Sequence, residues 1–528
     1  MTKIRIENAQ YLVTVDENDT ILTNATVVID NGVITEITTE DGDPTAKAPD
    51  GAEREATEGR ERKATDEERP EAERESSRRP LAGSGGGSHA LRGRAGVRAA
   101  GERADGLRPT DDSRSAAGDP TSDQNAEIVI DATGKLVMPG LVNLHTHLPM
   151  TLLRGLAENL DLDGFLQHLW AAEAAVMDEE TVKLGATLGA LESLLAGCTT
   201  QLDMYFHHEA THRGAVAAGS RHVIGPVFFD GPGPDGRAWP DRLAGLRAWP
   251  ALLDEIGGPR VPVCAMPHAT YTCSPDNLTE VVATLREVLA TSDRPGLLTT
   301  HVSETAAENA GIRERYDATP TELLARAGWL EPDLPLVLGH GVHLTEGDKA
   351  LVVAAGASIG HCPGSNLKLA SGALHWEEVQ AAGIRLGVGT DGCSSSNDLD
   401  MWQAMRQAAL LARLTSGRPD VASATEVLRA ATIEGARALG LGDEIGSVEV
   451  GKRADLVLVD LSAPHLTPVH DVAALLVFAA GRGDVTDVLV DGQVLVRDRR
   501  STRLDTDDLL TRARARGEVA RAAAGAVG

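Results

Sequence analysis

Residues 138–147 read MPGLVNLHTH, an apolar run that ends in two histidines. Such a run predicts a buried β-strand, and side chains at positions i and i+2 of a strand point to the same side. The imidazoles of His145 and His147 can therefore reach a single metal ion. This stretch predicts a pair of metal ligands at the end of a strand.

Seven further apolar runs follow, and segments with helical periodicity separate them. In residues 181–196, for example, leucines recur every three or four positions until Gly197 ends the pattern. Eight strand–helix repeats of this size predict an α/β fold, a (β/α)8 TIM barrel over residues 138–444. The seven runs are residues 200–203, 224–227, 264–268, 298–301, 337–340, 358–361 and 387–391.

Seven of the eight runs end in histidine or aspartate, and only the third, which ends in Val227, does not. A single histidine at a strand end is more often a core residue than a ligand. Seven ionisable ends are harder to explain by packing, because such groups are costly inside a barrel and barrel active sites lie at the C-terminal strand ends. The seven are His145, Asp203, His268, His301, His340, His361 and Asp391.

His301 and Asp391 are suited to complete a metal site with His145 and His147. Three imidazoles and one carboxylate, with one position left for water, suit Zn²⁺, with Fe²⁺ as the alternative. Such an ion lowers the pKa of its water to about 7. Because residues 184–348 contain no Lys, a second metal bridged by a carbamylated lysine on the fourth strand is excluded, and we expect one divalent ion.

Two further residues are candidates for catalysis. Glu304 follows His301 by three positions and is placed to move protons beside the water, although a Glu at a helix start is equally explained by the helix dipole. His340 could hydrogen-bond the nucleophile or polarise the leaving group. His343 is expected on the surface.

The two ends of the chain predict a second unit. Apolar and polar residues alternate, as they do in β-strands, in residues 1–40, 127–137 and 445–500, and these segments predict a small β-sandwich. Residues 501–528 predict a charged C-terminal helix. Residues 41–126 hold 19 acids, 15 bases, no aromatic residue and four residues from Val, Leu, Ile and Met. They predict a disordered insertion. A surface segment that the fold tolerates is the simpler interpretation, and a partner-binding tail is the alternative.

Composition excludes several classes of partner. The formal net charge is −28, whereas nucleic acids and anionic membranes are bound by basic surfaces. The sequence has no apolar run long enough to span a membrane, and its N-terminus lacks a signal-peptide pattern. Five cysteines without a C-x-x-C pair fit a reducing cytoplasm. We expect a cytoplasmic protein with a small-molecule substrate, no nucleic-acid or membrane partner, and homo-oligomerisation as an open question.

The chain resembles the amidohydrolase superfamily, and within it the deaminases of S-adenosylhomocysteine and 5′-methylthioadenosine. The similarity extends over nearly all of the chain outside residues 41–126. The motifs that carry it are MPGLVNLHTH (138–147), PMTLLRG (149–155), DMYFH (203–207), PHATYTCS (267–274), HVSET (301–305), SNLKL (365–369), GTDG (389–392) and GSVEVGK (446–452).

The resemblance implies a role for each matching residue. It assigns Glu304 and His340 to the surroundings of the hydrolytic water. It implies that Glu173 holds the ribose hydroxyls and that His268 makes a second contact with the sugar. It also implies that the metal ligands are His145, His147, His301 and Asp391.

One position departs from the family pattern. Relatives that bind the homocysteine carboxylate hold it with two arginines, and the first of these would fall at Pro226. The second could be Arg237 or Arg242. Because a carboxylate is usually held by a bidentate guanidinium, this departure favours a nucleoside with a smaller or uncharged 5′ group.

We therefore expect a metal-dependent hydrolytic deaminase of an adenosine-like nucleoside, with methylthioadenosine, deoxyadenosine or S-adenosylhomocysteine as candidate substrates. In this hypothesis Asp391 accepts the water proton, Glu304 protonates a ring nitrogen, and ammonia leaves. One alternative is another amidohydrolase activity, such as guanine or 8-oxoguanine deamination or triazine dechlorination. A second alternative is a metal-free interaction protein on the same scaffold.

Overall fold

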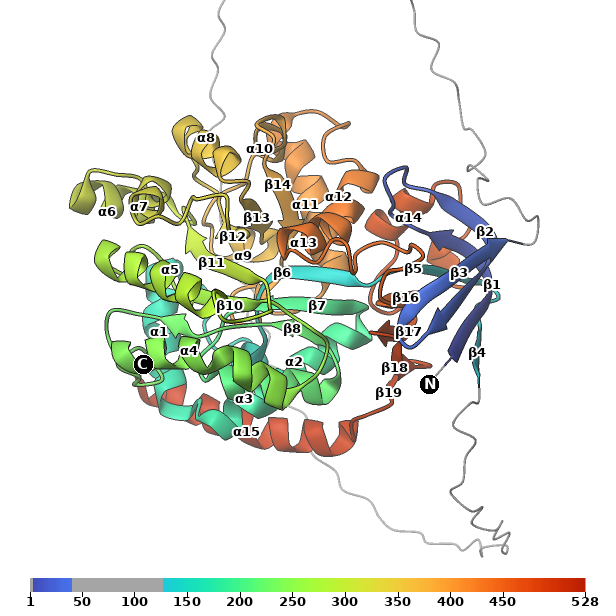
Figure 1. The fold of residues 1–528 in the computed structure, drawn as a ribbon, viewed down its shortest axis with the longest axis horizontal. Helices are drawn as coiled ribbons and strands as arrows, with labels where there is room; N and C mark the ends of the chain where they lie inside the picture. The colour runs from blue at the N-terminus through green and yellow to red at the C-terminus, as the bar shows by residue number, and fades with distance from the viewer. Residues whose placement is uncertain (1–2, 40–126, 528) are drawn as a thin grey trace, which may run out of the picture. The chain divides into compact units, whose positions relative to one another are not determined.

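The computed structural model describes residues 3–39 and 127–527, so the insertion predicted at 41–126 lies outside the described residues. Ten strands form two parallel sheets, with the orders β14-β13-β12-β11-β10-β9 and β15-β6-β7-β8 (Figure 1). Their bounds are β6 (Leu141–His147), β7 (Cys198–Asp203), β8 (Arg221–Val223), β9 (Val227–Phe228), β10 (Val263–Pro267), β11 (Gly296–Val302), β12 (Leu336–His340), β13 (Ser358–His361), β14 (Arg385–Val388) and β15 (Asp391–Gly392).

Helices alternate with these strands along the chain and lie around the parallel sheets in Figure 1. The helices between Leu148 and Ala438 are η1 (Leu148–Leu153), α1 (Leu162–Val176), α2 (Glu179–Leu195), α3 (His208–Ala218), α4 (Trp239–Ile256), α5 (Pro275–Leu289), α6 (Ala306–Tyr316), α7 (Pro320–Arg326), α8 (Glu346–Ala354), α9 (Pro363–Lys368), α10 (Trp376–Ala381), α11 (Met401–Ser416), α12 (Ala424–Ala430) and α13 (Ile433–Ala438).

The central strands are buried on both faces, which explains their continuous apolar sequences. Every residue of β6 and β11 is buried. Polar side chains in this interior are paired: the amide of Asn143 donates to the Thr390 hydroxyl at 2.7 Å and accepts from the Thr390 backbone N–H at 3.1 Å. This pairing ties β6 to the turn that leads into β15.

Strands from both ends of the chain form one nine-stranded sheet, in the order β19-β18-β17-β16-β5-β1-β2-β3, with β4 paired to β1. The described strands of this sheet are β1 (Lys3–Val13), β2 (Ile21–Asp30), β3 (Val33–Thr39), β4 (Ile128–Asp131), β5 (Lys135–Pro139), β16 (Leu456–Asp460), β17 (Val485–Val490), β18 (Gln493–Arg497) and β19 (Arg500–Ser501). Short helices η2 (Pro464–Leu466) and α14 (Val472–Phe478) connect β16 to β17.

The nine-stranded sheet is joined to the parallel strands by a buried ion pair. The guanidinium of Arg221, at the start of β8, donates to both carboxylate oxygens of Asp455 at 2.9 and 3.0 Å. The Arg221 side chain is 1% exposed. A bidentate pair at this depth is costly to break, because removing one partner leaves the other charge buried.

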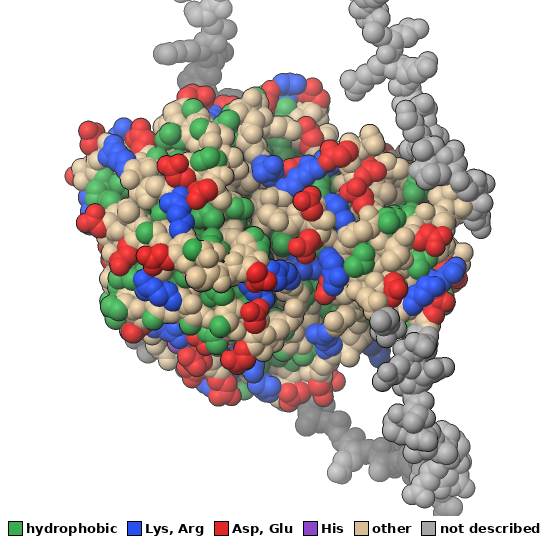
Figure 2. Space-filling model, viewed as in Figure 1, with side chains coloured by type: hydrophobic (Ala, Val, Ile, Leu, Met, Phe, Trp, Pro, Cys, Tyr) green, Lys and Arg blue, Asp and Glu red, His purple; other side chains and the backbone are tan. Residues whose placement is uncertain are grey.

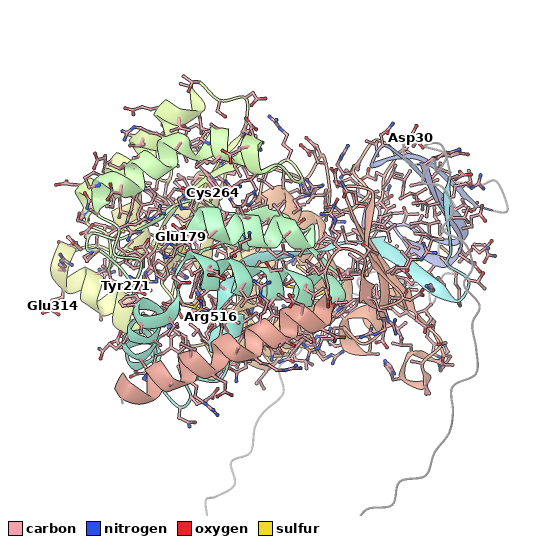
Figure 3. All side chains as sticks on the ribbon, turned by 90° about the horizontal axis from the view of Figure 1, so that it is seen from below. Asp30, Glu179, Cys264, Tyr271, Glu314 and Arg516 are labelled. Atoms are coloured by element: carbon pink, nitrogen blue, oxygen red, sulfur yellow. The ribbon has the colours of Figure 1, made fainter. Side chains whose placement is uncertain are left out.

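The C-terminal helix α15 (Thr506–Val527) covers part of the helical layer. Figure 3 shows α15, on which Arg516 is labelled, running along α1 and α2. Leu509 of α15 packs against Leu184 and Leu191 of α2. The leucine face that the sequence shows in α2 is therefore buried by the C-terminal helix.

The surface carries charged side chains of both signs, as the composition of the sequence indicates. On the face shown in Figure 2, acidic and basic side chains are interspersed. Among the described residues, no helix is both long and apolar enough to cross a membrane. All five cysteines are buried and unpaired.

Candidate active site

Strand pairing brings three of the predicted metal ligands together. Asp391 of β15 lies opposite Thr146 of β6, which places its carboxylate beside the two flanking histidines. Oδ1 of Asp391 is 3.0 Å from Nε2 of His147 and 3.6 Å from Nε2 of His145. The ligand atoms of this group lie within 4.8 Å of one another, close enough to bind one ion.

His301, at the end of β11, extends this cluster, because one of its ring nitrogens lies within 4.8 Å of ligand nitrogens of both His145 and His340. Its ring centroid is 4.7 Å from that of His145 and 5.5 Å from that of His147. His145 lies against Gly339, where an added Cβ would come within 3.2 Å of the His145 ring. A larger residue at position 339 would therefore displace a predicted ligand.

The hydrogen bonds of these imidazoles suit a metal. Nδ1 of His147 is 2.6 Å from the Met204 carbonyl oxygen, and Nδ1 of His301 is 2.7 Å from the His268 carbonyl oxygen. A carbonyl only accepts, so each Nδ1 carries a proton, and Nε2 is the ring nitrogen at which each histidine would bind a metal. Nε2 of His145 is buried without a hydrogen-bond partner. This donor set fits one divalent cation.

The electrostatics of the cluster also favour a cation. Burial holds the pKa values of His145 and His301 well below their usual range, so both rings are neutral. Burial would also lower the pKa of His147, but the hydrogen bond and charge of Asp391 outweigh it and raise this pKa to about 9. Although burial opposes ionisation of Asp391, the imidazoles hold its pKa well below its usual range. A carboxylate that attracts a proton so strongly to Nε2 equally attracts a metal ion.

Glu304 and His340 lie next to this cluster. Oε2 of Glu304 is 3.8 Å from Nε2 of His340, and both side chains are buried. Burial raises the pKa of Glu304, which favours its protonated form. Burial would lower the pKa of His340, but the carboxylates of Glu304 and Asp391 raise it. A buried carboxyl beside an imidazole is suited to holding and transferring protons.

Neighbouring polar side chains orient these groups. Nδ1 of His340 is 2.9 Å from Oδ1 of Asn366, so the proton is on Nδ1 and Nε2 faces Glu304. The hydroxyl of Ser395 donates to Oδ2 of Asp391 at 2.7 Å, which leaves Oδ1 toward the histidines. Asn366 lies in the SNLKL motif, but its spacing in the sequence did not indicate this role.

Glu308 supports the backbone that carries Glu304. Its carboxylate accepts the backbone N–H of Ser303 at 3.1 Å and that of Glu304 at 2.8 Å. Ser303 has a φ of 47°, in the left-handed region. Burial raises the pKa of Glu308 to about 7. Glu308 lies in the first turn of α6, after the N-cap residue Thr305. An acid at this position is common in helices, so the sequence did not indicate that its carboxylate contacts the turn before the helix.

A cavity that is open to solvent adjoins the cluster. Its polar lining includes seven predicted site residues and three that were not predicted. Its apolar lining comes mainly from α1. The predicted polar residues are His147, Glu173, His268, His301, Glu304, His340 and Asp391, the others are Tyr205, Tyr271 and Ser395, and the apolar ones include Met150, Leu162, Phe165, Leu166, Leu169 and Trp170.

The two residues predicted to contact a sugar both line this cavity. Glu173 of α1 is 2% exposed, and burial raises its pKa to about 7. Its Oε1 accepts the Tyr205 hydroxyl at 2.6 Å, whereas its Oε2 has no hydrogen-bond partner. The ring of His268 packs against Trp170 and Phe229, and burial lowers its pKa to about 3. A neutral imidazole and a free carboxylate oxygen are thus available to polar groups of a ligand.

Neither arginine that the sequence offered for a carboxylate lines the cavity. The guanidinium of Arg242 is buried and donates to the Asp235 carboxylate and to the carbonyls of Val227 and Pro232. Arg237 lies 3.7 Å from Glu179, outside the cavity. Among the described residues, no Lys or Arg lines the cavity.

His343 was expected on the surface, but its side chain is only partly exposed. The residue is half-buried, and its Nε2 donates to the Ser371 carbonyl oxygen at 2.7 Å. It does not line the cavity. Its role is to connect two loops, because the hydrogen bond links the turn after β12 to the segment after α9.

Comparisons with known proteins agree with these motifs. The model of the amidohydrolase family matches residues 136–495. The chain is 42% identical, over 70% of its length and 85% of the relative, to a 5-methylthioadenosine/S-adenosylhomocysteine deaminase of Thermococcus kodakarensis. It is 37% identical, over 75% of its length and 89% of the relative, to a 5′-deoxyadenosine deaminase of Methanosarcina mazei.

A solved structure is similar over nearly the whole chain. It is the crystal structure of an adenosine deaminase from Xanthomonas campestris with bound zinc, at a TM-score of 0.76 and 32% identity, covering 99% of this chain and 98% of that one. The family and this neighbour indicate a TIM-barrel-like fold with parallel sheets and a divalent metal. The chain therefore belongs to the amidohydrolase family, as its motifs predicted.

Proposed function

We propose that this protein is a metal-dependent hydrolytic deaminase of an adenosine-like nucleoside with an uncharged 5′ group. The observation that carries the proposal is that one cavity contains both kinds of group the reaction needs. The His147–Asp391 pair and Glu304 line this cavity, and so does the buried carboxyl of Glu173. The former suit hydrolysis, and the latter suits the hydroxyls of a sugar.

In this proposal His145, His147, His301 and Asp391 would hold a divalent ion, which supplies the Lewis acidity that makes water nucleophilic at neutral pH. The overall reaction replaces the 6-amino group of the purine with oxygen from water and releases ammonia. We propose Zn²⁺ rather than Fe²⁺, because a similar protein is described with bound zinc and because three imidazoles and a carboxylate are a usual zinc set.

The residues of the chain move the protons. Asp391 is held ionised by its neighbours and accepts the proton of the attacking water. Glu304, whose burial favours the protonated form, donates to a purine ring nitrogen and so makes the neighbouring carbon more electrophilic. His340, oriented by Asn366, hydrogen-bonds the oxygen that attacks the purine and so positions it.

The lining of the cavity indicates the substrate class. Glu173 would accept ribose hydroxyls, and His268 would contact the sugar from the other side. The 5′ group would meet apolar side chains rather than a guanidinium, because Arg242 is paired with Asp235 and position 226 is Pro. Methylthioadenosine and 5′-deoxyadenosine fit this lining better than S-adenosylhomocysteine, whose carboxylate would be buried without a cation. The names of the relatives support an adenosine-like nucleoside as the substrate.

A substrate screen on the metal-loaded protein tests the proposal. We expect ammonia release and the ultraviolet change from adenosine to inosine chromophore with 5′-deoxyadenosine and methylthioadenosine, and a kcat/KM at least about tenfold lower with S-adenosylhomocysteine. Turnover of guanine, 8-oxoguanine or a triazine alone would favour the first alternative. Absence of bound metal together with absence of any turnover would favour the interaction protein.

We also propose how the two parallel sheets and the terminal segments are organised. The two parallel sheets would close into one (β/α)8 barrel over residues 138–444, since short links join β8 to β9 and β14 to β15. Residues 1–40, 127–137 and 445–500 would form a β-sandwich, since side chains of β1, β2, β16 and β17 share one apolar cluster. The helix predicted for residues 501–528 begins only at Thr506 in the structure, because Ser501 still belongs to β19, and α15 would be a separate terminal unit. A cytoplasmic location and a homo-oligomeric state stay predictions.

A further inference from the structure

Tyr205 and Glu173 form an isolated buried pair in the wall of the cavity. Tyr205 follows β7, and Glu173 lies on α1. The two side chains are each 2% exposed, and both line the cavity. The only hydrogen bond found for either side chain among the described residues is the one that joins them, at 2.6 Å.

This hydrogen bond determines which oxygen of Glu173 is free. Oε1 is occupied by the Tyr205 hydroxyl, and Oε2 is buried without a partner. An unpaired buried carboxylate oxygen is costly, so such an oxygen in the wall of a cavity is suited to a ligand that supplies the missing donor. A hydroxyl group is the donor that a nucleoside sugar offers.

The same hydrogen bond affects the charge of Glu173. Burial raises the pKa of Glu173 to about 7, and the Tyr205 hydroxyl is the strongest group that acts against this rise. The charge of His147 also favours the ionised form of Glu173. A donor on Oε1 thus keeps the carboxyl available as an acceptor at Oε2.

We propose that Tyr205 is a positioning residue that orients Glu173 so that Oε2 accepts a ribose hydroxyl, and that it thereby sets the preference for ribosides. This inference rests on the proposed function, because it assumes that a nucleoside occupies the cavity. Tyr205 does not touch the reacting atoms. Its effect is on binding of the sugar rather than on the chemical step.

The test compares Tyr205→Phe with wild type on two substrates, 5′-deoxyadenosine and its 2′,3′-dideoxy counterpart. We expect KM for 5′-deoxyadenosine to rise about tenfold, the effect of about 1.4 kcal/mol, with kcat within about twofold of wild type. KM for the dideoxy compound should not change. Tyr316→Phe is the matched control, because Tyr316 lies on α6 beside Arg315 and does not line the cavity.

A double-mutant cycle with Glu173→Gln gives an independent measurement. If the two residues act as one unit, the double variant should lose no more riboside affinity than Glu173→Gln alone. Equal KM increases for both substrates, additive losses, or a fall in kcat alone would overturn the role of Tyr205 while leaving deamination intact. Wild-type protein that neither binds nor deaminates either nucleoside would instead overturn the proposed function, and this inference with it.

Discussion

Oδ1 of Asp391 lies 3.0 Å from Nε2 of His147, because β15 pairs in parallel with β6. The contact joins β6, the first of the parallel strands along the chain, to β15, the last of them. It also places one negative charge among three imidazoles.

Replacing Asp391 by Asn should remove the charge that favours a cation between the histidines. We expect the bound metal to fall well below one equivalent and kcat to fall by about 10³-fold or more. Elemental analysis and steady-state kinetics measure the two effects. Asp333→Asn, at an exposed ion pair with Arg286, is the control. Full metal content in Asp391→Asn would exclude Asp391 as a ligand.

Glu304→Gln should separate proton transfer from metal binding. The variant keeps the size of the side chain but cannot donate an acidic proton, so kcat should fall about 10²–10⁴-fold. Metal content should equal that of wild type, because Glu304 lies toward His340 rather than among the proposed ligands. Loss of the metal in this variant would show that Glu304 is a ligand instead.

Glu308→Gln should act on catalysis through the backbone. A carboxylate accepts both N–H groups of Ser303 and Glu304, whereas an amide has one acceptor oxygen and turns an NH₂ toward the second N–H. We expect kcat to fall about tenfold with unchanged metal content. Glu314→Gln, an exposed acid on the same helix (Figure 3), should have no effect. Equal activity of the two variants would remove Glu308 from the site.

Glu173→Gln should stabilise the protein at alkaline pH while weakening riboside binding. Burial raises the Glu173 pKa from 4.5 to about 7, so the folded protein loses stability as pH rises between these values and carries the full penalty above them. Removing the charge should raise the free energy of unfolding by about 3 kcal/mol at pH 8 and by less than about 1 kcal/mol at pH 5. Chemical denaturation at the two pH values measures the difference. An equal change at both would mean that burial of the charge is not the cause.

Replacing residues 41–126 by a flexible Gly/Ser linker should leave kcat and KM unchanged. All of the proposed ligands and cavity residues lie between His145 and Ser395, in the part of the chain that the structure describes. Kinetics of the shortened protein, with wild type as the reference, measure the effect. A large fall in kcat would show that the replaced segment contributes to the site.

The sequence was sufficient where chemistry is local. The i and i+2 spacing of His145 and His147 on an apolar strand needed no tertiary information, because strand geometry alone places both side chains on one side. The motifs around them predicted the amidohydrolase family, which the comparisons confirm. The alternation of apolar runs with helical segments likewise predicted parallel strands with helices between them.

Only the tertiary structure decided which polar groups face one another. The sequence offered Arg237 and Arg242 for a substrate carboxylate, but Arg242 is paired with Asp235, and neither lines the cavity. It offered no role for Tyr205, Asn366, Ser395 or Glu308, whose partners come from other strands and helices or across a turn. The physical reason is that residue type and local period determine which face of an element a side chain takes, whereas its hydrogen-bond partner depends on strand register and helix packing, which are set by the whole core.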